Sequence, residues 1–123
     1  MADVAIENGT LKIKLSLLDQ ALAFHSSFEI PLSHITNAYV SDLEELQLQF
    51  AIEATNLGLL KTVGVFANPQ GLIFADVGAG DCLVIATRGE RFPQIAVQLP
   101  KGKDPNAVAH EIMSQLPDSG PVD

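Results

Sequence analysis

The chain of 123 residues contains one cysteine, Cys82, no tryptophan and one tyrosine. A single cysteine excludes an intrachain disulfide, which fits the reducing cytoplasm where we expect the protein to reside. Seven Lys and Arg stand against fifteen Asp and Glu, so the formal net charge is −8. Because the phosphate backbone repels such a surface and few aromatic rings are present for base stacking, nucleic acid is not expected as a partner.

Long apolar runs are also missing. No stretch approaches the roughly 18 apolar residues of a membrane-spanning helix, and residues 1–15 lack the apolar centre of a secretory signal. Hydrophobic residues nevertheless make up 47% of the chain and charged residues only 18%, so a packed core is expected. We predict one domain over residues 1–117 and a short polar tail over residues 118–123.

Alternation of apolar and polar residues predicts short strands along most of the chain. Residues 4–15 have the pattern of a hairpin, with Asn8-Gly9 supplying the positive φ angles of a tight turn. Residues 16–24 predict one or two helical turns, capped by Ser16 and with Asp19 in the first turn. Leu18 and Leu22 lie four apart, and an adjacent apolar stripe comprises Leu17, Ala21 and Phe24. Further strands are predicted at 28–31, 35–41, 62–67, 72–76, 82–87 and 92–99.

Residues 42–62 carry conflicting signals. Ser41 and Glu44 have the spacing of a helical capping box. Against that reading, five apolar residues alternate with other residues as in a half-buried strand: Leu46, Leu48, Phe50, Ile52 and Ala54. Because five matches outweigh one capping signal, we predict a strand over 45–54, while a helix or a lid in the 42–62 stretch remains an alternative.

The last predicted element is a helix at about 105–116. Asp104 is a favourable N-cap, Pro105 suits the first helical position, and Pro117 ends the pattern. Its apolar stripe comprises Val108, Ala109, Ile112, Met113 and Leu116. A run of strands followed by one amphipathic helix predicts an antiparallel sandwich or barrel whose open end the helix plugs.

This order of elements resembles the bacterial pleckstrin-homology-like (PH-like) domain proteins. The matching stretches are residues 15–25 running into 28–35, then 64–66, 72–74, 83–85 and 92–97, and finally Asp104-Pro105 at the start of the helix. The resemblance implies a mainly β fold, an antiparallel PH-like barrel or sandwich of about seven or eight strands in two roughly orthogonal sheets, capped by one C-terminal α-helix. Residues 42–62 depart from the family pattern.

No catalytic or metal-binding pattern stands out in the sequence. His25, His34 and His110 lack the local spacing of metal ligands, and Cys82 begins an apolar strand as a small core residue would. Neither an enzyme, a cofactor nor a metal is expected. Because Lys12 and Lys14 are the only basic residues of the first hairpin, no binding to phosphoinositides or anionic membranes is expected either.

Two functions remain open. The resemblance and the lack of catalytic groups favour a non-enzymatic interaction or oligomerisation module, whose partner is itself or another protein. Six apolar residues are candidates for self-association, because a domain of this size leaves some apolar surface uncovered: Leu46, Leu48, Phe50, Leu57, Leu59 and Leu60. The alternative is a β-barrel that binds a small apolar ligand or lipid in a pocket lined by Phe50, Phe66 or Phe74.

Overall fold

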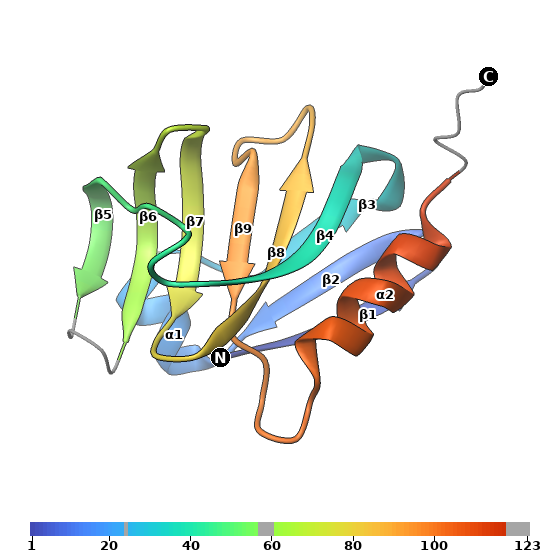
Figure 1. The fold of residues 1–123 in the computed structure, drawn as a ribbon, viewed down its shortest axis with the longest axis horizontal. Coiled ribbons are helices and arrows are strands. Elements are labelled where there is room, and N and C mark those ends of the chain that lie inside the picture. The colour runs from blue at the N-terminus through green and yellow to red at the C-terminus, as the bar shows by residue number, and fades with distance from the viewer. Residues whose placement is uncertain (24, 57–60, 118–123) are drawn as a thin grey trace.

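The computed structural model describes residues 1–23, 25–56 and 61–117, which form two facing β-sheets and two α-helices (Figure 1). The elements in chain order are β1 (Ala2–Glu7), β2 (Thr10–Leu15), α1 (Leu17–Ala23), β3 (Phe28–Pro31), a 3₁₀ turn (Leu32–His34), β4 (Ile35–Asp42), β5 (Phe50–Asn56), β6 (Thr62–Asn68), β7 (Gly71–Val77), β8 (Asp81–Thr87), β9 (Gln94–Val97) and α2 (Pro105–Gln115). The expected mainly β architecture with a C-terminal helix is therefore present.

The smaller sheet has the strand order β1-β2-β3 and is antiparallel throughout. Asn8 and Gly9 turn the chain with φ angles of 51° and 75°, as the predicted hairpin requires. Leu11, Ile13 and Leu15 are buried on the inner face, whereas the lysines between them face outward. Strict alternation in the sequence thus marks one buried and one wet face.

The larger sheet has the order β4-β8-β9-β7-β6-β5 and departs from the expected topology. β7 and β8 follow each other in the chain, but β9 lies between them (Figure 1). Since β7 and β8 run in opposite directions, β9 must be parallel to one of them, and Phe74 indeed pairs with Ile95 in a parallel register. The expected antiparallel barrel or sandwich is therefore confirmed only as two facing sheets, because β7 and β9 pair in parallel and, in the described residues, the sheets do not close into a barrel.

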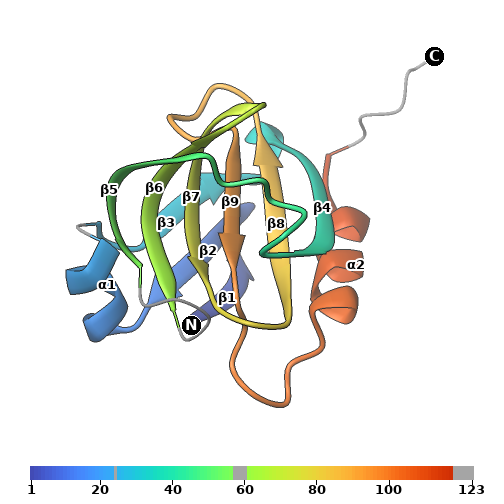
Figure 2. The ribbon, with the colours of Figure 1, turned by 60° about the vertical axis from the view of Figure 1, so that its left-hand side comes forward.

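The main core lies between the two sheets and α2. Leu11 and Ile13 from the small sheet meet Phe74 and Ile85 from the large sheet, all at 0% exposure. α2 lies against β4 and β8 (Figure 2) and buries Ile112 in this core. Its predicted start is confirmed, because the Asp104 side chain accepts a hydrogen bond from the backbone N–H of Asn106 at 2.9 Å.

The predicted stripe of α2 is only partly correct. Ala109 and Ile112 are buried, and Val108 and Leu116 pack partly against the core. Met113 is 42% exposed, although the sequence placed it in the same stripe. The contact face of α2 is thus narrower than the apolar face that its sequence offers.

The predicted strand over 45–54 was wrong in its first half. Residues 43–49, named here the crossing segment, pass over the outer face of the large sheet from β4 to β5, and the strand begins only at Phe50 (Figure 1). Asp42 caps a single turn, in which its carboxylate accepts the N–H of Glu45 at 2.9 Å and its carbonyl that of Leu46 at 3.1 Å. Gln47 has a φ of 54°, which breaks the extended conformation that alternation predicted.

α1 forms where it was predicted, but its buried side is different. The hydroxyl of Ser16 accepts a hydrogen bond from the Asp19 N–H at 3.1 Å and caps the helix. Leu17 and Leu18 are 83% and 66% exposed, whereas Asp19 is 2% exposed. The predicted apolar face was therefore wrong at Leu17 and Leu18, whereas Leu22 packs partly against the core and Phe24 lies outside the described residues. An ion pair inside the protein also holds this helix by Asp19.

Truncation of α2 tests how much the helix contributes. Ile112→Ala removes a side chain that is 1% exposed, and we expect it to lower the free energy of unfolding by about 2–5 kcal/mol. Urea denaturation followed by circular dichroism measures the change. Met113→Ala, one residue further on, is the matched control and should cost less than about 1 kcal/mol. Equal losses for the two variants would contradict the placement of α2.

Candidate functional site at the exposed edge of the large sheet

The edge strand β5 carries the exposed apolar side chains of the large sheet. Among the described residues β5 pairs with β6 alone, and Figure 1 shows it at one end of the sheet. Phe50 is 68% exposed and Ile52 is 59% exposed. Glu53 is the one charged residue of the strand. An edge with two large apolar side chains and one charge is available for pairing with another strand.

The pairing of β5 with β6 contains an irregularity. Ala51 lies opposite Phe66 and Glu53 lies opposite Val65, so Ile52 falls outside the described ladder. This arrangement is a β-bulge, which bends the strand and frees one residue from its neighbour. Ile52 is therefore held at the edge with its side chain in solvent.

Gly64 on β6 allows the backbone of β5 to lie close against β6. Its φ is 134°, and a Cβ atom on this residue would lie 2.4 Å from the carbonyl oxygen of Glu53 and 2.7 Å from the Cβ of Ala54. Both the backbone angle and the lack of space exclude any other residue without movement of β5. The position of the edge thus depends on one glycine of the neighbouring strand.

A groove of about 560 Å³ runs between the crossing segment and β5. Leu43 and Leu48 of the crossing segment, Phe50 and Ala51 of β5, and Phe66 of β6 supply its apolar lining. Glu44 is the one charged residue among those that line it. The groove therefore continues the apolar surface of the edge onto the outer face of the sheet.

The structure separates the six predicted self-association residues. Leu46 is 4% exposed and packs on the outer face of its own sheet, where the Asn68 side chain donates a hydrogen bond to its carbonyl at 3.1 Å. Leu48 is partly buried against the same cluster, and Phe50 is exposed. Leu57, Leu59 and Leu60 lie outside the described residues. Self-association through this group remains a prediction, and Phe50 is the member whose exposure supports it.

The three phenylalanines of the alternative ligand pocket do not surround one cavity. Phe74 is fully buried between the sheets, with its ring centroid 4.8 Å from that of Phe28. Phe66 is buried on the opposite face of the large sheet, and Phe50 is exposed at the rim. Phe50 and Phe66 share the groove described above, whereas Phe74 belongs to the core.

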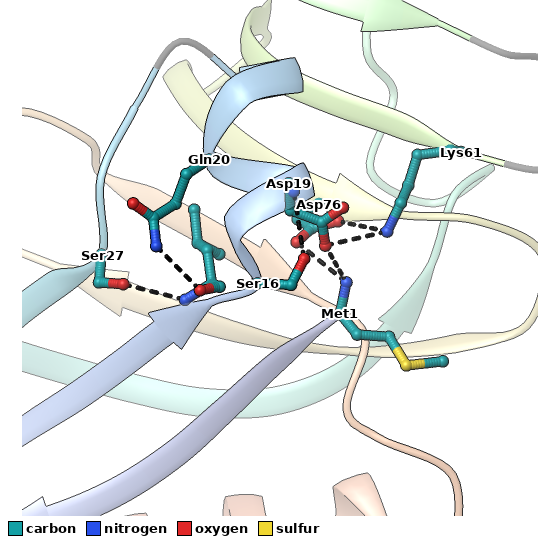
Figure 3. A network of polar contacts seen from close by, with 8 residues as sticks. Met1, Ser16, Asp19, Gln20, Ser27, Lys61 and Asp76 are labelled. Carbon is teal, nitrogen blue, oxygen red and sulfur yellow. Dashed lines mark hydrogen bonds and ion pairs between the residues drawn. The ribbon is translucent and has the colours of Figure 1, made fainter.

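A buried cluster of charges lies where β6 begins and β7 ends (Figure 3). Lys61 Nζ lies 3.0 Å from Asp19 Oδ2 and 3.1 Å from Asp76 Oδ1. The amino group of Met1 lies 3.1 Å from Asp76 Oδ2 and also contacts Asp19. Two carboxylates and two ammonium groups therefore balance one another and connect α1, β7 and the start of β6.

The two carboxylates of this cluster differ in their affinity for protons. Burial alone would raise the pKa of Asp19, but its interaction with Asp76 and the hydrogen bonds that it accepts from the amino group of Met1 and from Lys61 outweigh burial and lower the pKa from 3.8 to about 2. Burial and the hydrogen bond to Asp19 raise the pKa of Asp76 above its ordinary value. Burial would lower the pKa of Lys61, but its contacts with the cluster raise it. Contacts within the cluster thus favour the charged forms of Asp19 and Lys61.

Sequence reasoning missed this cluster because its members are far apart in the chain. Asp19 was interpreted as a first-turn helical residue, and Asp76 as the last residue of the predicted strand 72–76. One signal was available, since Asp76 is two residues after Phe74 and so points to the same, buried face of its strand. An acidic residue at an inward position of an apolar strand indicates a buried ion pair.

The other reactive side chains have local partners. His25 stacks on Phe28 with a centroid distance of 4.4 Å, and His34 Nδ1 lies 2.6 Å from Glu90 Oε2. Cys82 is fully buried, as expected, and burial together with the nearby carboxylate of Asp42 raises the pKa of its thiol to about 12. Within the described part of the chain, no three His, Cys, Asp or Glu side chains are grouped as metal ligands.

Comparisons with family models, with curated proteins and with solved structures gave no match. Of the helices in residues 1–23, 25–56 and 61–117, none has the length and apolar character needed to span a membrane.

The charged cluster predicts a specific dependence of stability on pH. Because the pKa of folded Asp19 lies below its ordinary value, its contribution is present above about pH 4 and is lost as the pH falls toward 2. Asp19→Asn should therefore cost about 2 kcal/mol at pH 7, and this difference from wild type should shrink between pH 4 and pH 2. Urea denaturation at each pH measures it.

Asp3→Asn provides the control for this experiment, because Asp3 is an exposed carboxylate on the nearby strand β1. It should change the unfolding free energy by less than about 0.5 kcal/mol at either pH. A difference between Asp19→Asn and wild type that stays constant from pH 7 to pH 2 would contradict the assigned role.

Proposed function

We propose that this chain is a non-enzymatic interaction module of PH-like type that associates with copies of itself through β5. The exposure of Phe50 and Ile52 on an edge strand carries the proposal. Large apolar side chains on a free edge cost solvation energy in a monomer and regain it in contact with another chain. The sequence resemblance to PH-like domains supports the module class.

The other sheet edges are better protected. β1 carries Asp3 and Glu7, and β3 carries Glu29 and ends at Pro31. Charged residues and proline are the usual means by which edges avoid pairing. β4, the opposite edge of the large sheet, has α2 packed against it (Figure 2). β5 has α1 packed against it and a bulge at Ile52, but among the described residues it is the one edge strand with exposed large apolar side chains.

The charge of the molecule also favours this surface. Two copies with a formal net charge of −8 each repel one another, so a stable contact must form where acidic residues are few. β5 has one acidic residue in seven, and the groove beside it adds Glu44. Contact through β5 thus brings few charges together.

Binding of a small apolar ligand is the second candidate. The groove of about 560 Å³ with Leu48, Phe50 and Phe66 in its lining is the observation that favours it. A fluorescent apolar probe that binds wild type but not Phe50→Thr, with no change in molecular mass, would support this candidate over self-association.

Replacement of the exposed apolar residues tests self-association. Phe50→Thr/Ile52→Thr places threonine, a β-branched residue that favours strands, at both positions while removing most of the apolar surface. Wild type should have a mass above the 13.1 kDa of one chain, and the double variant should return to 13.1 kDa. Light scattering behind a sizing column measures the mass over a hundredfold range of concentration.

Leu17→Gln/Leu18→Gln is the matched control, because it removes two apolar residues of comparable exposure from α1 and retains helix-forming residues. This variant should keep the mass of wild type. Both double variants should still unfold cooperatively in urea. A wild-type mass of 13.1 kDa throughout, or equal dissociation by both double variants, would overturn the proposal.

A further inference from the structure

We infer that the partner at β5 is a second copy of β5, paired antiparallel about a two-fold axis that passes beside Ile52. This inference rests on the proposed function and specifies its geometry. The two large sheets would then join edge to edge and form one sheet that runs through both copies.

The exposure of Ile52 points to this residue as the centre. Ile52 falls outside the described ladder with β6 and is 59% exposed on the edge strand. Its side chain therefore leaves apolar surface uncovered on the face of the sheet beside the free edge. At a two-fold axis the same residue of the second copy lies directly opposite, so two isoleucines cover each other.

The register about Ile52 also suits its neighbours. Two residues before and after the axis, Phe50 of one copy lies opposite Ala54 of the other, so a large side chain meets a small one. One residue from the axis, Glu53 lies opposite Ala51. Each of these pairs occurs twice by symmetry, which makes the contact self-complementary.

Neighbouring registers are less favourable. An axis at Glu53 sets two carboxylates directly opposite each other, and like charges in that position destabilise a strand pair. An axis at Ala51 sets Ile52 opposite Phe50 but leaves Glu53 opposite Gln49, which lies outside the strand. The register at Ile52 keeps five consecutive residues of each copy, 50–54, within the strand and separates the two carboxylates.

The groove beside β5 supports a contact that is wider than the two strands. Leu48 and Phe66 line it next to Phe50 and Ala51, so apolar surface continues from the edge onto the outer face. In the register about Ile52, the exposed Phe50 of the second copy lies opposite Ala54, toward the Asn56 end of the groove lining. The same apolar surface is then covered in both copies, which an isologous contact requires.

Disulfide cross-linking of single-cysteine variants reads the register directly. The native Cys82 is fully buried and its thiol pKa is about 12, so it stays unreactive in folded protein at pH 8. Cysteine is introduced singly at positions 50–54, and the full chain is oxidised with oxidised glutathione. Directly opposed residues in an antiparallel pair have Cα atoms about 4.5–5.5 Å apart, which a disulfide can bridge.

Ile52→Cys should form a covalent dimer at least tenfold faster than Phe50→Cys or Ala54→Cys, whose equivalent residues lie four positions apart along the pair. The double variant Phe50→Cys/Ala54→Cys should also cross-link, because the thiol at position 50 of one copy lies opposite the thiol at position 54 of the other. Leu17→Cys, at an 83% exposed position on α1, gives the rate of random collision.

The outcomes separate this inference from the proposed function. A dimer by light scattering with the fastest cross-linking at position 52 supports both. A dimer in which positions 50–54 cross-link no faster than position 17 overturns the β5 pairing, while self-association survives. Fastest cross-linking at another position overturns the register. A monomer by light scattering at every concentration overturns the pairing and the proposed function together.

Discussion

The structure depends on one constraint, which is that the chain leaves the large sheet at one edge and re-enters it at the other. Asp42 ends β4 and Phe50 begins β5, with the crossing segment of residues 43–49 between them. This segment must pass over the outer face of the intervening strands (Figure 1). It therefore covers that apolar face with Leu46 and Leu48, and it delivers β5 to an edge where β6 is the neighbour on one side. The groove and the exposed edge both result from this path.

The buried cluster of charges determines where α1 lies. Lys61 lies just before β6, and Asp19 belongs to a helix of seven residues that is too short to be stable by itself. Their contact, together with Asp76 in β7, holds α1 against β5 and β6. A buried ion pair of this kind fixes a position more than it adds net stability, because desolvation offsets much of the Coulomb attraction. Leu17 and Leu18 can consequently remain exposed while the helix stays in place.

Local signals in the sequence predicted the local structure well. The Asn8-Gly9 hairpin, the Ser16 cap and the start of α2 after Asp104 each depend on residues within one turn of each other, and all three were found. The order of strands could not be read in the same way, because it depends on contacts between distant segments. Alternation at Leu46 and Leu48 was real, but those side chains alternate along a crossing segment and not along a strand. In the candidate site, sequence alone pointed to Phe50, whereas the bulge at Ile52 depends on β6 and was invisible.

The central position of β9 has a consequence for the order in which this protein can form. β4 and β8 make one pair, and β5, β6 and β7 make a separate meander, until β9 enters between β8 and β7. On the ribosome, the residues that join these two parts, 94–97, are therefore among the last of the sheet to be synthesised. Before then, β7 and β8 each present an unpaired inner edge that is rich in apolar residues. A nascent chain that ends before β9 therefore leaves the large sheet in two parts, each with an unpaired apolar edge, and pairing with β9 joins the two parts.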